Sequence, residues 1–441
     1  MAQEVLPGSV RRGYALGGVA TGSFGTVPGL LLLPYLTDRL GVAAGLAGLI
    51  VFLPKAWDVV LNPIAGRISD RSTNPAGRRR PFLLRAGLAL AVAFALLFAG
   101  PVAPTWLGAG WVVLLFLACA TAYAFFQVPY VAMPAELTDD YDERTRLMSW
   151  RVAVLALAIL VSGGLSPMVR DALGPEWGYR GVGLFVGALI ALGALGAWWG
   201  TRRAVLREVA APAASLREQL RIVAAARDFR TLLLAYVLQA LATAAMLAGV
   251  DYVARGLMGS SGLSTILFVC FVAPALVVTP LWQRVGQRAG KRTGFLVASL
   301  LLGGGALAAL VGMRLGVAAL AASVAVVGVG YAGTQMFPLA MLPDIAAVDA
   351  SRTGENRAGV YTGVWTAAET FGMALGPFAY AAVLAGGGYV SSTSGAVAQP
   401  DSALRAMELG FTVLPAVLVG VSLVFLLRYR LDARAVEEAT R

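Results

Sequence analysis

The sequence predicts an all-α membrane protein with twelve transmembrane helices in two six-helix bundles. Three observations support this fold class. The chain of 441 residues is 58% hydrophobic and only 13% charged, its mean hydropathy is +0.75, and its apolar segments recur at lengths that can cross a hydrocarbon core of ~30 Å. A soluble globular domain of this length does not have such a composition, so the soluble classes are excluded.

Each predicted helix is a run of about 20 mostly apolar residues, and the loops between the runs carry charged residues or the Gly and Pro residues that end helices. In chain order the predicted spans are Gly13–Leu36, Ala43–Ile64, Leu83–Ala103, Trp106–Met133, Met148–Met168, Gly181–Gly200, Leu232–Val253, Ser264–Leu281, Phe295–Met313, Gly316–Met336, Val360–Ala385 and Leu409–Leu427.

The longest polar stretch between predicted helices runs from Thr201 to Phe229 and divides the chain in two. We therefore predict an N-terminal six-helix bundle over residues 1–200, a cytoplasmic linker over 201–229 and a C-terminal bundle over 230–441. Within the linker, Ser215-Leu216-Arg217-Glu218 has the spacing of a helix capping box. The amphipathic run behind it, through Arg227, predicts a helix along the membrane face, with a flexible linker as the alternative.

The net charge of +11 is concentrated in alternate loops. By the positive-inside rule, this pattern places both termini in the cytoplasm and predicts a multi-pass protein of the plasma (inner) membrane. The clusters carry no interleaved aromatic residues, so we expect no nucleic-acid partner. The basic groups on the predicted cytoplasmic side are Arg11/Arg12, Arg67–Arg80, Arg202–Arg221, Arg284–Arg292 and Arg428–Arg434, whereas Arg39, Arg170 and Arg314 are scattered on the other side.

The chain has no histidine, and its two cysteines, Cys119 and Cys270, lie singly in predicted helices. We therefore expect no metal site, no disulfide framework and no cofactor. No clustered nucleophile or phosphate-binding loop is present either, so an enzyme is not expected. Asp and Glu remain as the proton carriers near neutral pH.

Two features recur in both halves and indicate an internal duplication. The first feature is a proline near a helix end, followed four residues later by an arginine and then by a loop of glycine, a basic residue and arginine. It occurs at Pro63, Arg67 and Gly77–Arg79, and again at Pro280, Arg284 and Gly290–Arg292. A helix end framed by two prolines and followed by acidic residues occurs at Pro129–Glu136 and again at Pro338–Asp344. The repetition fits two pseudo-symmetric bundles related by an axis along the membrane normal.

Gly66-x3-Asp70-Arg71 followed by Gly77-Arg78-Arg79-Arg80 resembles the loop signature of the major facilitator superfamily. More narrowly, Lys55-Ala56-Trp57-Asp58 with Asn62-Pro63, the Gln127 to Arg151 region, and Gly363 to Thr370 resemble the glycoside–pentoside–hexuronide:cation symporters. The resemblance implies a major facilitator fold, with a solute site between the halves. It also implies uptake of a sugar or similar solute coupled to Na⁺, Li⁺ or H⁺.

When the family's cation site is carried over position by position, Asp58 matches its first carboxylate. Asn62 stands where the family has a second carboxylate, and Ala124 stands where the family has a hydroxyl on helix four. The sugar-binding aspartates of the family's galactoside carriers fall at Gly22 and Gln127. The family's arginine is retained as Arg151. A helix-eleven lysine is replaced near Thr370, where acidic Glu369 is the neighbour.

Four residues are the candidates for coupling: Asp58, Lys55, Asn62 and Glu369. Na⁺ needs several hard oxygen ligands, which this set supplies poorly, whereas H⁺ needs a single carboxylate, so the sequence favours H⁺. Asp58 and Glu369 are placed about half a membrane deep, in opposite halves, as a coupling pair would be. Alternatively, Lys55 and Asp58 neutralise each other at i,i+3, and Glu369 pairs with Arg357 or Arg151.

Aromatic faces and amides are the groups that stack on sugar rings and hydrogen-bond to hydroxyls. On this ground and on the resemblance, the candidate substrate-binding residues are Gly22, Trp57, Gln127, Tyr130, Arg151, Gln335, Trp365 and Thr366. For the aromatic residues, helix packing is the alternative role. The loss of cavity carboxylates relative to galactoside carriers suggests a less hydroxyl-rich or more hydrophobic solute.

Six further residues, near the end of the second predicted helix and in the loop after it, fit a gating latch at the cytoplasmic helix ends better than a substrate site. The glycines permit close helix contact, and the aspartate can bridge arginines. Solvated charge that only sets the topology is the alternative role. The residues are Gly66, Asp70, Arg71, Gly77, Arg78 and Arg79.

The sequence therefore predicts a monomeric, cation-coupled secondary transporter in the lipid bilayer. It moves a small sugar- or glycoside-like solute by alternating access, with H⁺ favoured over Na⁺ as the coupling ion. The alternative is an exporter of hydrophobic natural products, drugs or lipids on the same fold.

Overall fold

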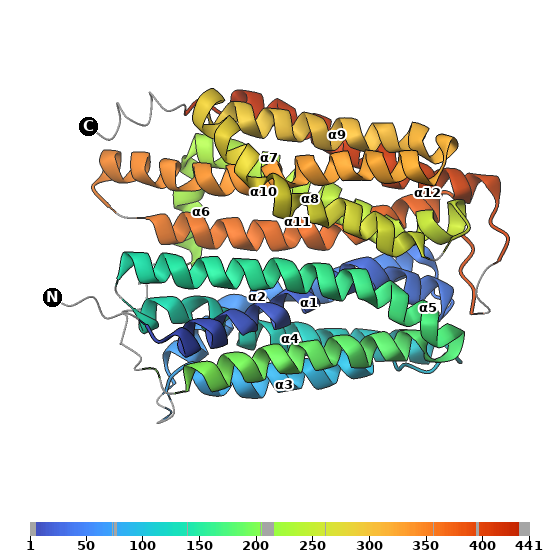
Figure 1. Ribbon diagram of the computed structural model, residues 1–441, viewed down its shortest axis with the longest axis horizontal. Helices are drawn as coiled ribbons and strands as arrows, with labels where there is room; N and C mark the ends of the chain where they lie inside the picture. Colours follow the sequence, from blue (N-terminus) through green and yellow to red (C-terminus); the bar gives the residue numbers. More distant parts are fainter. Residues whose placement is uncertain are drawn as a thin grey trace. The chain divides into compact units, whose positions relative to one another are not determined.

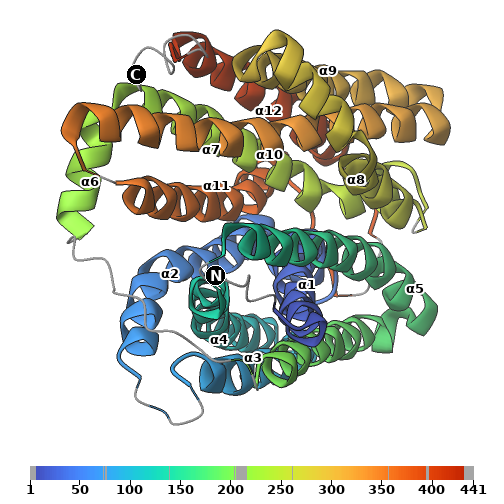
Figure 2. The same ribbon diagram turned by 60° about the vertical axis from the view of Figure 1, so that its left-hand side comes forward.

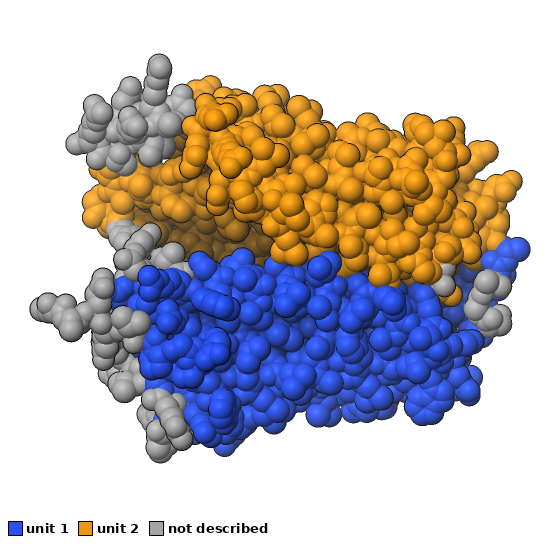
Figure 3. All heavy atoms as spheres, viewed as in Figure 1, with its two compact units in different colours: residues 1–211, 390–398 blue, residues 212–389, 399–441 orange. Residues whose placement is uncertain are grey.

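The computed structural model describes residues 6–72, 74, 77–138, 140–202, 204, 216–260, 262–355, 357–393 and 397–431. These residues form helices, short turns and loops, without a strand in the described ranges. The chain divides into two compact units (Figure 3). Unit 1 comprises residues 1–211 and 390–398, and unit 2 comprises residues 212–389 and 399–441. Residue Ser215, which opens the expected capping box, lies outside the described residues.

The described residues of unit 1 form five helices, labelled in Figure 1: α1 (Gly8–Asp38), α2 (Ala44–Asp70), α3 (Arg80–Leu97), α4 (Thr105–Leu137) and α5 (Tyr141–Thr201). The most buried of them is α1, which packs along α5, while α4 packs against both α2 and α3 (Figure 2). The segment 390–398 also belongs to this unit, where the amide of Ser392 donates to the carbonyl of Thr37 at 3.0 Å.

Unit 2 contains α6 (Leu216–Ala225), α7 (Arg227–Tyr252), a π-helical turn (Val253–Leu257), α8 (Leu263–Ala289), α9 (Lys291–Leu315), α10 (Val317–Thr353), α11 (Ala358–Gly386) and α12 (Asp401–Arg428). Its most buried long helix is α7. The Gln239 amide of α7 donates to Ser299 Oγ of α9 at 2.9 Å and to Ser422 Oγ of α12 at 2.8 Å. A buried side chain on α7 therefore ties three helices of this unit together.

The structure confirms the all-α membrane fold, although it has eleven described helices long and apolar enough to span a membrane rather than twelve. The difference lies in α5, whose 61 residues contain both Met148–Met168 and Gly181–Gly200. Gly174 interrupts this helix with φ 72° and ψ −175°, and Pro175 follows. Two predicted spans are thus joined by a bend at one residue instead of by a loop. Only glycine adopts this backbone conformation without strain.

Close approach of α1 and α5 depends on facing glycines. A Cβ built on Gly13 would lie 2.3 Å from the Cα of Gly200, a distance at which the backbones must move apart. Small residues at such crossings let membrane helices gain close van der Waals contact.

We therefore expect Gly13→Ala to lower the free energy of unfolding by about 1–3 kcal/mol, the usual range for an overpacked contact. Thermal unfolding of the purified protein in detergent measures this change. Gly25→Ala on the same helix is the matched control, because nothing lies within 4 Å of its added Cβ. Equal melting temperatures for the two variants would show that the α1–α5 crossing tolerates a methyl group.

Candidate functional site

Asp58 lies on the buried face of α2, in step with the apolar residues that hold this helix in unit 1. Val51, Pro54, Leu61 and Ala65 are buried at spacings of three or four residues along this face. The Asp58 residue is only 4% exposed. Its Oδ1 atom has no hydrogen-bond partner among the described residues. Burying a carboxylate oxygen without a hydrogen-bond partner costs free energy, so a bound cation, a proton or a water molecule would stabilise this site.

Three described residues matched to the family's cation site, or adjoining Asp58 on its helix, supply one amide and neither a hydroxyl nor a second carboxylate. Lys55 is half-buried one turn earlier and interacts with Asp58 electrostatically, but the two form no ion pair in the described part of the chain. Asn62 is half-buried one turn later. Ala124 of α4 is fully buried against Leu61 and Ala65, so α4 presents a methyl group there and no hydroxyl.

Tyr130 and Arg151 form a second polar contact in unit 1, and Gln127 lies one helical turn before Tyr130 on α4. The guanidinium of Arg151 lies over the Tyr130 ring, with its central carbon 5.2 Å from the ring centroid. Tyr130 is fully buried: its ring stacks on Tyr14 at 4.7 Å, and its hydroxyl donates to the Tyr14 carbonyl at 2.8 Å. Gln127 Oε1 and Arg151 Nε have no hydrogen-bond partner among the described residues. Each of these buried atoms is therefore open to a polar ligand or a water molecule.

The structure gives two other candidate substrate residues of unit 1 different surroundings. Gly22 is buried where α1 crosses α5, and a Cβ on it would lie 3.0 Å from the Leu155 carbonyl oxygen. Its absent side chain therefore permits helix packing. Trp57 is 45% exposed on α2, on a different face from Asp58.

In unit 2 the candidates Gln335, Trp365 and Glu369 meet around Tyr236, which is not one of the residues predicted from the sequence. Tyr236 Oη lies 2.5 Å from Glu369 Oε1 and 2.9 Å from Gln335 Oε1. The Trp365 ring stacks on the Tyr236 ring at 4.6 Å, and the Trp365 Nε1 has no partner among the described residues. No motif marks Tyr236, since a tyrosine in an apolar helix reads as ordinary packing.

The remaining unit 2 candidates are less involved in this network. Thr366 is exposed, and its hydroxyl donates to the Thr362 carbonyl at 3.0 Å. Arg357, considered as a partner of Glu369, instead donates to Glu355 at 2.9 Å and lies 3.8 Å from Asp349.

The candidate gating residues form a charge cluster at the helix ends of unit 1. Arg79 donates from Nη2 to Asp70 Oδ1 at 2.9 Å and from Nε to Glu136 Oε1 of α4. Arg78 donates to the backbone carbonyl of Asp70. In the sequence, Glu136 stands out only as part of the repeated helix end. Its side chain is 1% exposed, so the cluster is largely closed to solvent on that side.

The other gating candidates lie at the edge of this cluster. Gly77 has φ 104°, which suits glycine at the turn before Arg78. Arg71 is exposed at the end of α2. Gly66 has room for a methyl group, because an added Cβ would meet Val128 at 3.6 Å, an ordinary contact distance.

Unit 2 carries a similar pair at the corresponding repeat position. Lys291, which follows Gly290, lies 2.6 Å from Asp344 Oδ2 and also donates to the Ala340 carbonyl. The duplicated loop and helix end therefore form an ion pair in each unit. In unit 2 that pair is more exposed, at 44% for Lys291 and 25% for Asp344.

Comparison with known proteins gives consistent matches over nearly the whole chain. The family described as "MFS/sugar transport protein" matches residues 13–433. A putative glycoside/cation symporter of Escherichia coli is 26% identical, with 97% of this chain and 93% of the relative covered. An isoprimeverose transporter of Lactiplantibacillus pentosus is 25% identical, with coverage of 98% and 90%. The crystal structure of a D-xylose–proton symporter superposes with a TM-score of 0.72 at 12% identity, covering 97% of this chain and 98% of that one.

Proposed function

Because the chain belongs to the MFS/sugar transport protein family, among the glycoside–pentoside–hexuronide:cation symporters, we propose that it carries a sugar- or glycoside-like solute together with a proton by alternating access. We place it in the plasma membrane with both termini in the cytoplasm, because the basic residues gather in alternate loops.

The observation that carries the choice of ion is the chemistry around Asp58. Its carboxylate is buried with an unpartnered oxygen, Ala124 supplies no hydroxyl, and Asn62 supplies a neutral amide in place of a second carboxylate. Na⁺ is a hard cation that prefers several oxygen ligands, whereas a proton needs only one. This donor set therefore favours H⁺. Protonation would also remove the buried charge that Asp58 otherwise carries.

A second protonatable group is the Glu369–Tyr236–Gln335 network of unit 2. The Tyr236 hydroxyl has one proton but lies within hydrogen-bond distance of two acceptor atoms, Glu369 Oε1 and Gln335 Oε1. If Glu369 is protonated, it donates to Tyr236, which then donates to Gln335. If Glu369 is ionised, Tyr236 donates to Glu369, and a rotated Gln335 amide donates to Tyr236. The network therefore accommodates both charge states of Glu369.

Removing the Tyr236 hydroxyl should impair the gain and loss of a proton at Glu369 while leaving the packing of the ring intact. We expect Tyr236→Phe to lower proton-driven uptake about tenfold, since a hydrogen bond to a charged group contributes ~1.5–3 kcal/mol. The phenyl ring keeps the stack on Trp365. Tyr380→Phe, which removes another buried hydroxyl of unit 2, is the matched control. Similar uptake by the two variants would contradict a role for the Tyr236 hydroxyl.

The proposed solute class rests on the polar groups of unit 1. Gln127 Oε1 and Arg151 Nε are an acceptor and a donor without partners in the described part of the chain, beside the aromatic Tyr130. Hydroxyl groups both donate and accept, so a sugar or glycoside can supply the partner that either atom needs. The relatives with matching sequences include a putative glycoside/cation symporter and an isoprimeverose transporter.

Uptake into proteoliposomes tests this function. Purified protein is offered radiolabelled isoprimeverose, D-xylose or a glucuronide, with an imposed pH gradient at zero Na⁺ or an imposed Na⁺ gradient at equal pH. We expect accumulation of at least one glycoside with the pH gradient alone. Accumulation only with the Na⁺ gradient would contradict proton coupling.

The same vesicles distinguish the exporter alternative. A fluorescent amphiphile is loaded in place of the glycoside, and its loss is followed as the gradient is imposed. Gradient-driven loss of the amphiphile, with no transport of the sugars, would replace the symport proposal by export of a hydrophobic compound.

A further inference from the structure

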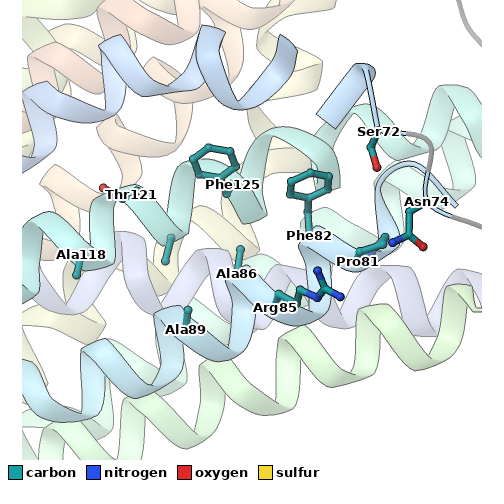
Figure 4. Close-up of a pocket in the computed structure, with 11 residues that line it drawn as sticks. Ser72, Asn74, Pro81, Phe82, Arg85, Ala86, Ala89, Ala118, Thr121 and Phe125 are labelled. Atoms are coloured by element: carbon teal, nitrogen blue, oxygen red, sulfur yellow. The ribbon is translucent and has the colours of Figure 1, made fainter. Parts of the chain in front are cut away.

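Unit 1 contains a pocket of about 620 Å³ between α3, α4 and the segment that follows α2 (Figure 4). Its volume lies within the range of ~300–1,000 Å³ typical of ligand sites. None of the coupling, substrate or gating candidates lines it. Ser72, Asn74 and Arg85 lie toward one end, while Ala89 and Ala118 lie toward the other (Figure 4).

The long walls of this pocket are apolar and belong to helices that can span a membrane. Ala86 and Ala89 of α3 and Ala118 and Ala122 of α4 recur at helical spacing, so small side chains leave a channel between the two helices. The rings of Phe82 and Phe125 stack near its polar end, 6.3 Å apart at an interplanar angle of 14°. Such a surface suits a hydrocarbon chain better than a hydroxyl-rich solute.

The polar end carries a cation, the Arg85 guanidinium, that has no partner among the described residues. Arg85 is exposed on α3 and makes no ion pair or hydrogen bond with any residue that the structure describes. It follows the start of α3 at Arg80 by five residues, or roughly 7.5 Å along the helix axis. At this depth an arginine of a spanning helix lies near the boundary of headgroups and acyl chains, where it needs a polar partner.

The basic residues around Arg85 indicate that its partner is negatively charged. Arg67 and Arg71 are also exposed at the adjoining end of α2, so the mouth of the pocket lies at a basic helix end. Basic residues near a membrane surface attract anionic lipids by ~1 kcal/mol each. A guanidinium can bind a phosphate through two parallel hydrogen bonds. The site thus combines a phosphate-binding cation with an adjoining apolar channel.

We propose that this pocket binds one anionic phospholipid, with its phosphate on Arg85 beside Ser72 and Asn74 and an acyl chain between α3 and α4. The site is separate from solute coupling, and its occupant is a lipid of the bilayer rather than a transported solute. Because the proposed lipid contacts α3, α4, Ser72 and Asn74, it joins three parts of unit 1.

Native mass spectrometry of delipidated protein in detergent tests the site, with phosphatidylglycerol and phosphatidylcholine as the probes. We expect one saturable phosphatidylglycerol site that discriminates against phosphatidylcholine. Arg85→Gln should weaken phosphatidylglycerol binding about tenfold, the effect of losing a charge-assisted hydrogen bond. Arg288→Gln, which removes an exposed arginine at the end of α8, should leave the affinity unchanged.

A second pair of variants tests the acyl-chain channel. Ala118→Trp should fill it and abolish the saturable site, whereas Leu114→Trp, at a position of α4 that does not line the pocket, should not. Equal losses in Arg85→Gln and Arg288→Gln, or unchanged binding in Ala118→Trp, would overturn the proposal. Displacement of phosphatidylglycerol by millimolar inorganic phosphate would instead indicate a free-anion site and also overturn it.

Discussion

Replacement of Asp58 by asparagine is expected to abolish accumulation of solute against a gradient while preserving solute exchange across the membrane. The amide keeps the size of the buried side chain at a position that is only 4% exposed, but it cannot take up and release a proton. Without a coupled ion, a carrier can only equilibrate its solute, so the accumulation ratio should fall to about one. Radiolabelled uptake and counterflow in proteoliposomes measure the two activities separately.

Two further variants isolate the role of the Asp58 carboxylate. Asp58→Glu retains a protonatable group and should keep part of the accumulation. Asp401→Asn makes the same chemical change at the exposed N-terminus of α12 and should leave both activities unaltered. Undiminished accumulation in Asp58→Asn would remove this residue from the coupling mechanism, whereas loss of both accumulation and counterflow would indicate a structural role.

The second large effect is expected at the charge cluster of Arg79, Asp70 and Glu136. Arg79→Gln leaves Glu136 without its ion partner at a position where its side chain is 1% exposed. Breaking a buried ion pair on one side typically costs about 3–5 kcal/mol, because an uncompensated charge remains. We therefore expect a melting temperature lower by roughly 10 °C in detergent.

The Lys291–Asp344 ion pair of unit 2, at the corresponding repeat position, is the matched control for Arg79→Gln. Lys291→Gln removes the partner of Asp344, but both side chains are partly exposed, so a change of at most ~1 kcal/mol is expected. The double variant Arg79→Gln/Glu136→Gln should recover part of the stability lost in Arg79→Gln, because it removes the stranded charge as well. Equal shifts for Arg79→Gln and Lys291→Gln would contradict the importance of burial at Glu136.

Hydrophobic segment length and the quoted motifs were sufficient to predict the fold class and the family, and both are confirmed. Both follow from local sequence, since a spanning helix satisfies its own backbone and reads as an apolar run. The bend at Gly174 was not predicted, because a single glycine conformation interrupts α5 without a polar loop.

The site was less accessible to sequence reasoning, because its interactions join distant segments. Tyr236 contacts a glutamate 133 residues away, and Arg79 contacts Glu136 across 57 residues. Neither spacing follows from a helical period. Asp58 stands out in the sequence as a carboxylate within an apolar segment, but its place on the buried face of α2 and the packing of Gly22 against α5 required three-dimensional contacts. The roles of the site residues stay predictions.

Proton movement during solute uptake is the most direct measurement of coupling at Asp58. Vesicles of the wild type and of Asp58→Asn are given the transported glycoside in weakly buffered, Na⁺-free medium, and the external pH is recorded. We expect the wild type to make the medium more alkaline as protons enter with the solute, and Asp58→Asn to move solute without this change. Solute uptake by the wild type with no proton movement, or an identical pH change in Asp58→Asn, would contradict proton coupling through this carboxylate.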